Sequence, residues 1–163
     1  MNQKETAIGQ IITVTLPDGT SREFPAGVTV GKILALVNKN KEKTTVAGAF
    51  NGRLIGTDTP LSENGTLDFV SLDSPEGREI LRHSTSHVMA QAVQDLFPEA
   101  KISIGPAIEN GFYYDFDYSR PFTTEDFDGI EKRMQEIIAK DQPFVREELS
   151  KQEATSLFKS RNE

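Results

Sequence analysis

Apolar and polar residues alternate along most of the first seventy positions, and one stretch of helical spacing interrupts the alternation. After Thr29, which suits an N-cap, the apolar residues Val30, Ile33, Leu34 and Val37 recur at helical intervals. The flanking segments alternate with period two and contain turn sequences such as Pro-Asp-Gly-Thr and Asn-Gly. Strands are predicted within residues 10–16, 21–27, 44–55 (as a hairpin) and 60–71. This order predicts a small β-grasp (ubiquitin-like) sheet wrapped on one helix.

Helical spacing returns in the second part of the chain, from Gly77 to Leu96, and Pro98 marks its end. Alternation around Gly105-Pro106 and around Asn110-Gly111 then predicts two paired strands. Three further elements are predicted, namely a helix over 123–140 capped by Thr123 or Thr124, a strand over 143–150 and a helix over 151–160.

A polar segment with Pro75 and Gly77 joins the two patterns and predicts a domain boundary near residue 72. The fold class is therefore α+β, with a β-grasp domain over 1–72 followed by an α/β domain over 73–163. Three or more strands with an apolar face are usually needed for independent stability, and the second part offers only two or three. We therefore expect the second domain to be truncated, with the chain ending inside a larger domain.

Composition narrows the class of protein. The 163 residues include no cysteine, so disulfides and thiolate metal sites are excluded, and no apolar run is long enough to span a membrane or to act as a secretion signal. We expect a cytoplasmic protein. The net charge of −7 comes from residues 73–163, which carry eleven basic and eighteen acidic side chains. Such a surface binds phosphates poorly, so any nucleic acid would be held mainly by other parts of a larger protein.

The strongest chemical candidate is the pair His83 and His87, the only histidines in the sequence. Four positions apart on a helix, the two imidazoles can converge on one water, metal or substrate atom. The zinc protease motif is excluded, because Ser84 stands where the general base Glu is required. A different zinc site needs a third ligand such as Asp115 or Asp117. The other readings are a metal-free hydrolytic pair and a surface pair without function.

The segment FYYDFD, residues 112–117, is the second candidate. Alternation sends Phe112, Tyr114 and Phe116 to one face of a strand and the residues between them to the other. A half-buried strand explains the aromatic residues, and the Tyr114 hydroxyl can still reach a pocket. The preceding segment IGPAIENG, which contains Gly105, can supply backbone donors, although turn geometry explains its Gly and Pro equally well.

Taken together, these motifs resemble the N-terminal region of bacterial threonyl-tRNA synthetases. The stretch VTLPDGTSREFPAGVTVGKILALVN is similar to the start of their TGS domain, a β-grasp module also found in certain GTPases and stringent-response enzymes. The stretch from LRHSTSHVMAQAV through IGPAIENGFYYDFDYSRPFT is similar to the opening of their editing domain. Its HxxxH pattern is shared with alanyl-tRNA synthetases and their free-standing editing relatives.

This resemblance implies a site that hydrolyses serine wrongly attached to tRNA(Thr). It implies that His83 and His87 are catalytic and that Tyr114 and Gly105 bind the substrate at the tRNA 3′ end. The family completes the site with a later Cys-x-x-x-His element, and this sequence contains neither a cysteine nor a third histidine. The family's catalytic domain, which uses ATP, magnesium and zinc, and its anticodon-binding domain have no counterpart here.

We therefore expect an N-terminal fragment of a threonine–tRNA ligase, a class II aminoacyl-tRNA synthetase, inactive by itself and holding no cofactor or metal. The parent is expected to be a homodimer through domains that this chain lacks, and the fragment a monomer. Two alternatives stay open, namely an RNA- or protein-binding regulatory module built on a TGS domain and a stand-alone accessory protein. The downstream reading frame separates these possibilities.

Overall fold

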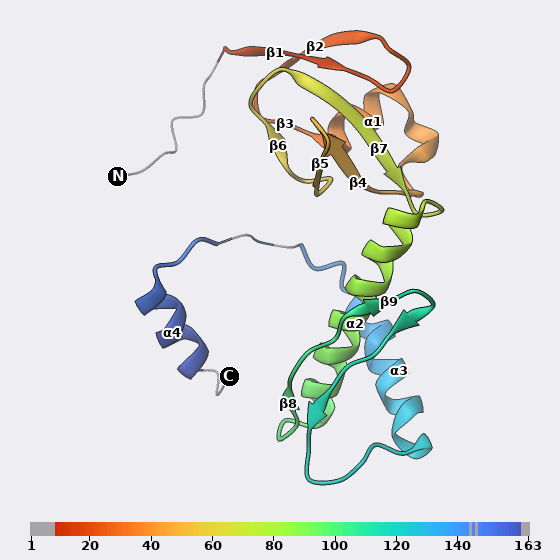
Figure 1. Ribbon diagram of the computed structural model, residues 1–163, viewed down its shortest axis with the longest axis vertical. Helices are drawn as coiled ribbons and strands as arrows, with labels where there is room; N and C mark the ends of the chain where they lie inside the picture. The colour runs from red at the N-terminus through yellow and green to blue at the C-terminus, as the bar shows by residue number, and fades with distance from the viewer. Residues whose placement is uncertain (1–8, 144, 146, 161–163) are drawn as a thin grey trace. The chain divides into compact units, whose positions relative to one another are not determined.

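Five strands of the first unit form one mixed sheet (Figure 1). The computed structural model describes residues 9–143, 145 and 147–160. The strands are β1 (Ile11–Thr15), β2 (Ser21–Pro25), β4 (Thr45–Phe50), β5 (Arg53–Ile55) and β7 (Gly65–Ser71). Their order is β2-β1-β7-β4-β5, in which only the β1–β7 pair is parallel. The predicted β-grasp arrangement is confirmed.

Helix α1 (Val30–Val37) covers one face of this sheet because its apolar positions share one side. Val30 and Ile33 are fully buried among Ile12, Val14 and Leu67 of the strands. Thr29 caps the helix as predicted, since its side chain accepts a hydrogen bond of 3.3 Å from the Lys32 N–H.

Short elements complete the first unit. They are the antiparallel pair β3 (Val28–Thr29) and β6 (Pro60–Leu61) and the 3-10 turn η1 (Lys39–Lys41). The sequence pattern did not predict β3 and η1 as separate elements, because two or three residues carry no periodicity, and it did not separate β6 from the last strand within 60–71. The hairpin β4–β5 does turn at Asn51-Gly52, where both φ angles are positive, +49° and +76°. Positive φ at both central residues is what a two-residue hairpin turn requires.

Gly48 in β4 allows α1 to approach the sheet closely. A Cβ on this residue would lie 2.9 Å from Val30 Cγ1 and 3.1 Å from Leu67 Cδ1, both in the buried core. We expect Gly48→Ala to lower the unfolding free energy by about 1–3 kcal/mol, as overpacked cores do. Denaturant unfolding followed through the NMR signals of residues 11–71 measures this change.

The matched control is Gly111→Ala, where an added Cβ meets nothing within 4 Å and φ is not in the left-handed region. Equal midpoints for the two variants would contradict the close packing of Val30 against Gly48.

The second unit consists of helices and a narrow strand ribbon. Its elements are the part of α2 (Pro75–Leu96) that follows Leu81, β8 (Lys101–Ile102), β9 (Ala107–Ile108), β10 (Gly111–Phe112), β11 (Phe116–Asp117), α3 (Thr124–Ala139) and α4 (Lys151–Ser160). Strand β9 pairs with β10 and β8 with β11, both antiparallel. The chain turns once, at residues 109–110, and Gly105-Pro106 lies in the segment that separates β8 from β9.

The core of this unit lies between α2, α3 and the ribbon. Ala92, Val93 and Ala100 are buried against Ile130 and Ile137 of α3. Five aromatic rings extend this core in a chain of ring contacts, namely Tyr114, Phe116, Phe122, Tyr118 and Phe97. The mixed α and β content that the pattern predicted for this part is confirmed.

One predicted element is wrong for the described residues. Residues 143, 145 and 147–150 form no strand, and residues 144 and 146 of the predicted strand lie outside the described residues. A strand is defined by hydrogen bonds to a partner, and no described strand pairs with this segment. Helix α4 occupies the predicted residues, and none of its described side chains is buried.

Contacts between residues divide the chain into two units, Met1–Leu81 and Arg82–Glu163. The division falls inside α2, since the first turn of that helix packs on the end of β7. Gly77 is buried there, and a Cβ on it would overlap the Ser71 carbonyl. The domain boundary near residue 72 stays a prediction.

Candidate functional site

His83 and His87 meet on α2. Their Nε2 atoms are 3.1 Å apart, and the rings stand edge to face with centroids 4.6 Å apart. A hydrogen bond between two imidazoles needs one N–H donor and one unprotonated acceptor, so the contact holds one ring in each role. Both residues are exposed. The pair is thus accessible and able to present a donor or an acceptor to a water molecule.

Ser86 connects this helix to the strand ribbon. Its side chain is fully buried, and its hydroxyl donates to the carbonyl of His83 at 2.7 Å and lies 3.2 Å from the carbonyl of Gly105. Nineteen residues separate Ser86 from Gly105 in the sequence, so this contact joins two different parts of the unit. Helical periodicity does not predict this contact, because it does not distinguish a buried serine from an exposed one.

Gly105 is required by packing more than by turn geometry. Its φ is not in the left-handed region, and a Cβ placed on it would overlap the ring of Tyr114. The aromatic ring therefore lies directly over the Gly105 backbone. The structure brings together Gly105 and Tyr114, two of the predicted site residues, and Ser86 ties Gly105 to the helix that carries the other two.

The alternation predicted for residues 112–117 appears in their burial. Phe112, Tyr114 and Phe116 are half-buried, whereas Tyr113 and Asp115 are exposed. The rings of Tyr114 and Phe116 stack with centroids 5.1 Å apart. Stacking and the contact with Gly105 fix the Tyr114 ring from two sides.

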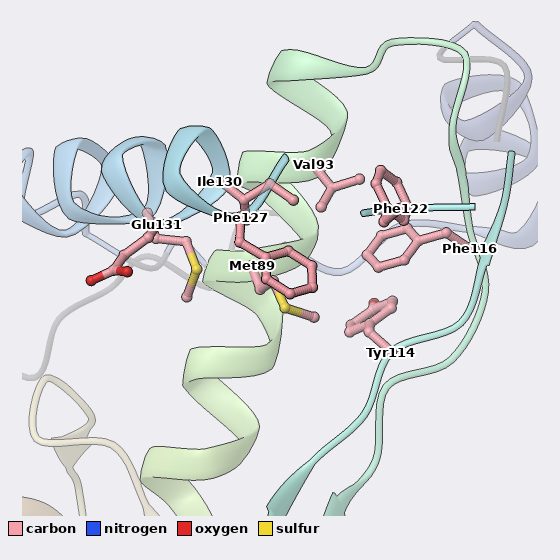
Figure 2. A pocket seen from close by; sticks show the side chains of 9 residues that line it. Met89, Val93, Tyr114, Phe116, Phe122, Phe127, Ile130 and Glu131 are labelled. Atoms are coloured by element: carbon pink, nitrogen blue, oxygen red, sulfur yellow. The ribbon is translucent and has the colours of Figure 1, made fainter. Parts of the chain in front are cut away.

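An apolar pocket of about 340 Å³ lies on the side of α2 that faces α3 and β11 (Figure 2). Its lining comprises Met89, Val93, Tyr114, Phe116, Phe122, Phe127, Ile130, Glu131 and Met134. Tyr114 is the one predicted site residue in this lining, and neither histidine belongs to it. Sequence reasoning missed the pocket, since its walls come from three segments whose apolar residues all looked like core.

An ion pair with two hydrogen bonds lies at the start of α3. The Arg120 guanidinium donates to both carboxylate oxygens of Asp126, at 2.7 and 2.8 Å, and the Thr123 N–H donates to the same carboxylate at 2.8 Å. These bonds, those from Arg120 first, hold the pKa of Asp126 well below its usual range. The guanidinium also lies over the rings of Phe97 and Tyr118.

We expect Arg120→Gln to raise the pKa of Asp126 toward the ordinary value for aspartate, about 3.9, because the guanidinium contributes most to the shift. A lowered pKa stabilises the fold above the ordinary value, and this stability is lost as the pH falls toward the folded pKa. NMR titration of the Asp126 carboxyl carbon measures the shift. Arg133→Gln is the control, since Arg133 pairs with Asp95 and Glu136; an unchanged Asp126 midpoint in Arg120→Gln would contradict the assignment.

The zinc alternative gains no support from the arrangement of ligands. Among the described residues, no three side chains of His, Cys, Asp or Glu gather closely enough to hold a metal ion. Asp115 and Asp117 are exposed on the ribbon and do not join the histidines in such a group.

In the part of the chain that the structure describes, no helix has the length and apolar character needed to cross a membrane.

Comparison with known proteins gives one family match and a set of relatives similar to almost the whole sequence. Residues 12–71 match the family model of the TGS domain. Threonine–tRNA ligases of Citrifermentans bemidjiense and Geobacter sp. (strain M21) are 47% and 48% identical over 152 residues, 93% of this chain and 24% of each relative. The threonine–tRNA ligase of Symbiobacterium thermophilum is 43% identical over 156 residues, 96% of this chain and 24% of the relative.

The chain spans about a quarter of the length of these curated relatives. The resemblance to threonyl-tRNA synthetases inferred from the motifs is confirmed. Nearly half of the aligned residues are identical, and the alignment covers almost the whole chain. The matches extend past the first unit through the histidine helix and the ribbon, because 152 residues cannot be accommodated in the TGS segment alone. Residues 12–71 match the TGS domain family, in a chain whose sequence is similar over more than nine-tenths of its length to threonine–tRNA ligases.

Proposed function

We propose that this chain supplies one wall of a site that hydrolyses serine from mischarged tRNA(Thr). The observation that carries the proposal is the convergence of the His83 and His87 Nε2 atoms, 3.1 Å apart, on an exposed part of the helix that Ser86 ties to Gly105. The chain that contains this histidine pair is 48% identical over 152 residues to a threonine–tRNA ligase.

The chemistry needs a water molecule held against an ester carbonyl. A neutral imidazole can accept a proton from water with one nitrogen, and its neighbour can hold the ring in one tautomer. Such a site is useful to a threonine enzyme because one methyl group gives only about 1–3 kcal/mol of discrimination. Serine, which is smaller and also hydroxylated, therefore has to be removed after attachment.

Each predicted residue has a role in this proposal. His83 and His87 orient or activate the water, and Tyr114 and Gly105 receive the terminal adenosine of the tRNA. The family resemblance assigns a later Cys-x-x-x-His element to the same site, which these 163 residues cannot supply. We infer that the isolated chain neither hydrolyses the ester nor forms it.

The proposed substrate, location, cofactors and oligomeric state follow from the similarity to threonine–tRNA ligases. The substrate is the 3′ end of tRNA(Thr), and the reaction takes place in the cytoplasm. ATP, magnesium and zinc serve the ligase reaction in the part of the relatives outside the matched quarter, and the same part makes the homodimer. The isolated chain is a monomer.

A chimera tests the proposal. This chain replaces the matching 152-residue segment of the Geobacter sp. (strain M21) ligase, and deacylation of seryl-tRNA(Thr) is followed with threonyl-tRNA(Thr) as the comparison. The chimera should hydrolyse the seryl ester faster than the threonyl ester. A chimera that aminoacylates tRNA(Thr) normally but never releases serine would contradict the proposal.

A further inference from the structure

Ser86 is the only fully buried polar side chain among the described residues. It lies one turn after His83 on α2 and directly before His87. Its single hydroxyl hydrogen is shared between the carbonyls of His83 and Gly105, at 2.7 and 3.2 Å, as a three-centre hydrogen bond. The bond to His83 is the local kind that any serine in a helix can make. The contact with Gly105 is different, because it holds a second segment against the helix.

The segment around Gly105 contacts Tyr114, the tyrosine of the candidate site. Gly105 has no side chain, and the Tyr114 ring fills the space that a Cβ would need. The backbone next to Gly105 is further fixed to the segment that carries Tyr114, since the Asp115 N–H donates to the Ile104 carbonyl at 2.9 Å. A shift of Gly105 away from α2 would therefore move Tyr114 with it.

We propose that Ser86 is a positioning residue that fixes the distance between the histidine pair and the Gly105–Tyr114 surface. This inference rests on the proposed function, and it adds a residue that the motif HxxxH does not include. In that function the histidines act at the ester and Tyr114 receives the terminal adenosine that carries it, so the distance between them decides whether the water meets the ester carbonyl. A misplacement of about 1 Å can lower a rate by about 10²-fold.

The test compares two serines of the same helix in the chimera with the Geobacter sp. (strain M21) ligase. Ser86→Ala removes the buried hydroxyl, whereas Ser84→Ala removes the hydroxyl of an exposed serine between the same histidines. We expect Ser86→Ala to lower kcat for seryl-tRNA deacylation by 10-fold or more, with KM changed less than threefold. Ser84→Ala should stay within twofold of the parent in both constants.

A spectroscopic measurement on the 163-residue chain separates positioning from general loss of structure. In Ser86→Ala, the carbonyl carbon of Gly105 and the ring signals of Tyr114 should shift, while the signals of residues 11–71 stay unchanged. Ser84→Ala should move neither Gly105 nor Tyr114.

The outcomes distinguish this inference from the function on which it rests. If His83→Ala/His87→Ala abolishes deacylation while Ser86→Ala keeps the parent kcat, the proposed function stands and the positioning role is wrong. If the double histidine variant is fully active, the proposed hydrolytic function is wrong, and the positioning role of Ser86, which depends on it, is wrong as well. Unshifted Gly105 and Tyr114 signals in Ser86→Ala would also overturn the positioning role.

Discussion

Replacing His83 and His87 together by alanine should lower the rate of seryl-tRNA(Thr) deacylation in the chimera by about 10² to 10⁴-fold, the effect expected for loss of a general base. The two Nε2 atoms are 3.1 Å apart, so the rings act as one unit. Single replacements should each cost nearly as much as the double replacement, because residues that act together are not additive. A rapid-quench assay with preformed seryl-tRNA(Thr) measures the rate.

The fold should tolerate these replacements. Both side chains are exposed, and alanine is the residue that favours a helix most. Gln91→Ala, an exposed position one turn further along α2, is the matched control and should keep the parent rate. Aminoacylation with threonine should change little in every variant. A double variant that deacylates at the parent rate would mean that His83 and His87 are surface residues without a role in the reaction.

Secondary structure could be predicted best from the sequence where a helix or strand buries one face and exposes the other. In the first unit, period-two alternation predicted the strands, and the spacing after Thr29 predicted α1 with its cap. The Asn51-Gly52 turn followed from backbone geometry, since both residues adopt positive φ. These features are local, so a short stretch of residues contains the information that determines them.

The features that sequence reasoning missed depend on contacts between distant segments. Ser86 differs from Ser84 only in which residues approach it, and the approach of Gly105 comes from nineteen positions away. The apolar pocket is similar, because Met89, Tyr114 and Met134 come from three separate segments of the chain. A strand was predicted over 143–150 from its local sequence, but a local sequence does not supply a partner for the hydrogen bonds of a strand. Likewise Gly105 could be assigned to turn geometry until the Tyr114 ring was seen to lie over it.

The isolated 163-residue chain should bind tRNA(Thr) no more tightly than micromolar at near-physiological salt, which is the range of about 10⁻⁴ to 10⁻⁶ M for nonspecific nucleic-acid binding. Its first 72 residues carry seven basic and seven acidic side chains, and the remainder carries eleven and eighteen. Lys and Arg provide most of the affinity for phosphates, so a surface with excess carboxylates repels the tRNA backbone. The chimera, which includes the other three quarters of the Geobacter sp. ligase, should bind at least 100-fold more tightly.

Fluorescence titration with labelled tRNA(Thr) at several salt concentrations measures the affinity and the share of it that comes from contacts with phosphates. The slope of log K against log salt counts the phosphates neutralised, and it should be shallow for the isolated chain and steep for the chimera. The histidine pair contributes little to binding, so His83→Ala/His87→Ala should leave both affinities unchanged while it abolishes deacylation. Nanomolar binding by the isolated chain, with the same salt slope as the chimera, would show that these 163 residues hold the tRNA themselves. In that case the acidic surface of residues 73–163 would lie away from the RNA, and the TGS domain would be the first place to look for the contact.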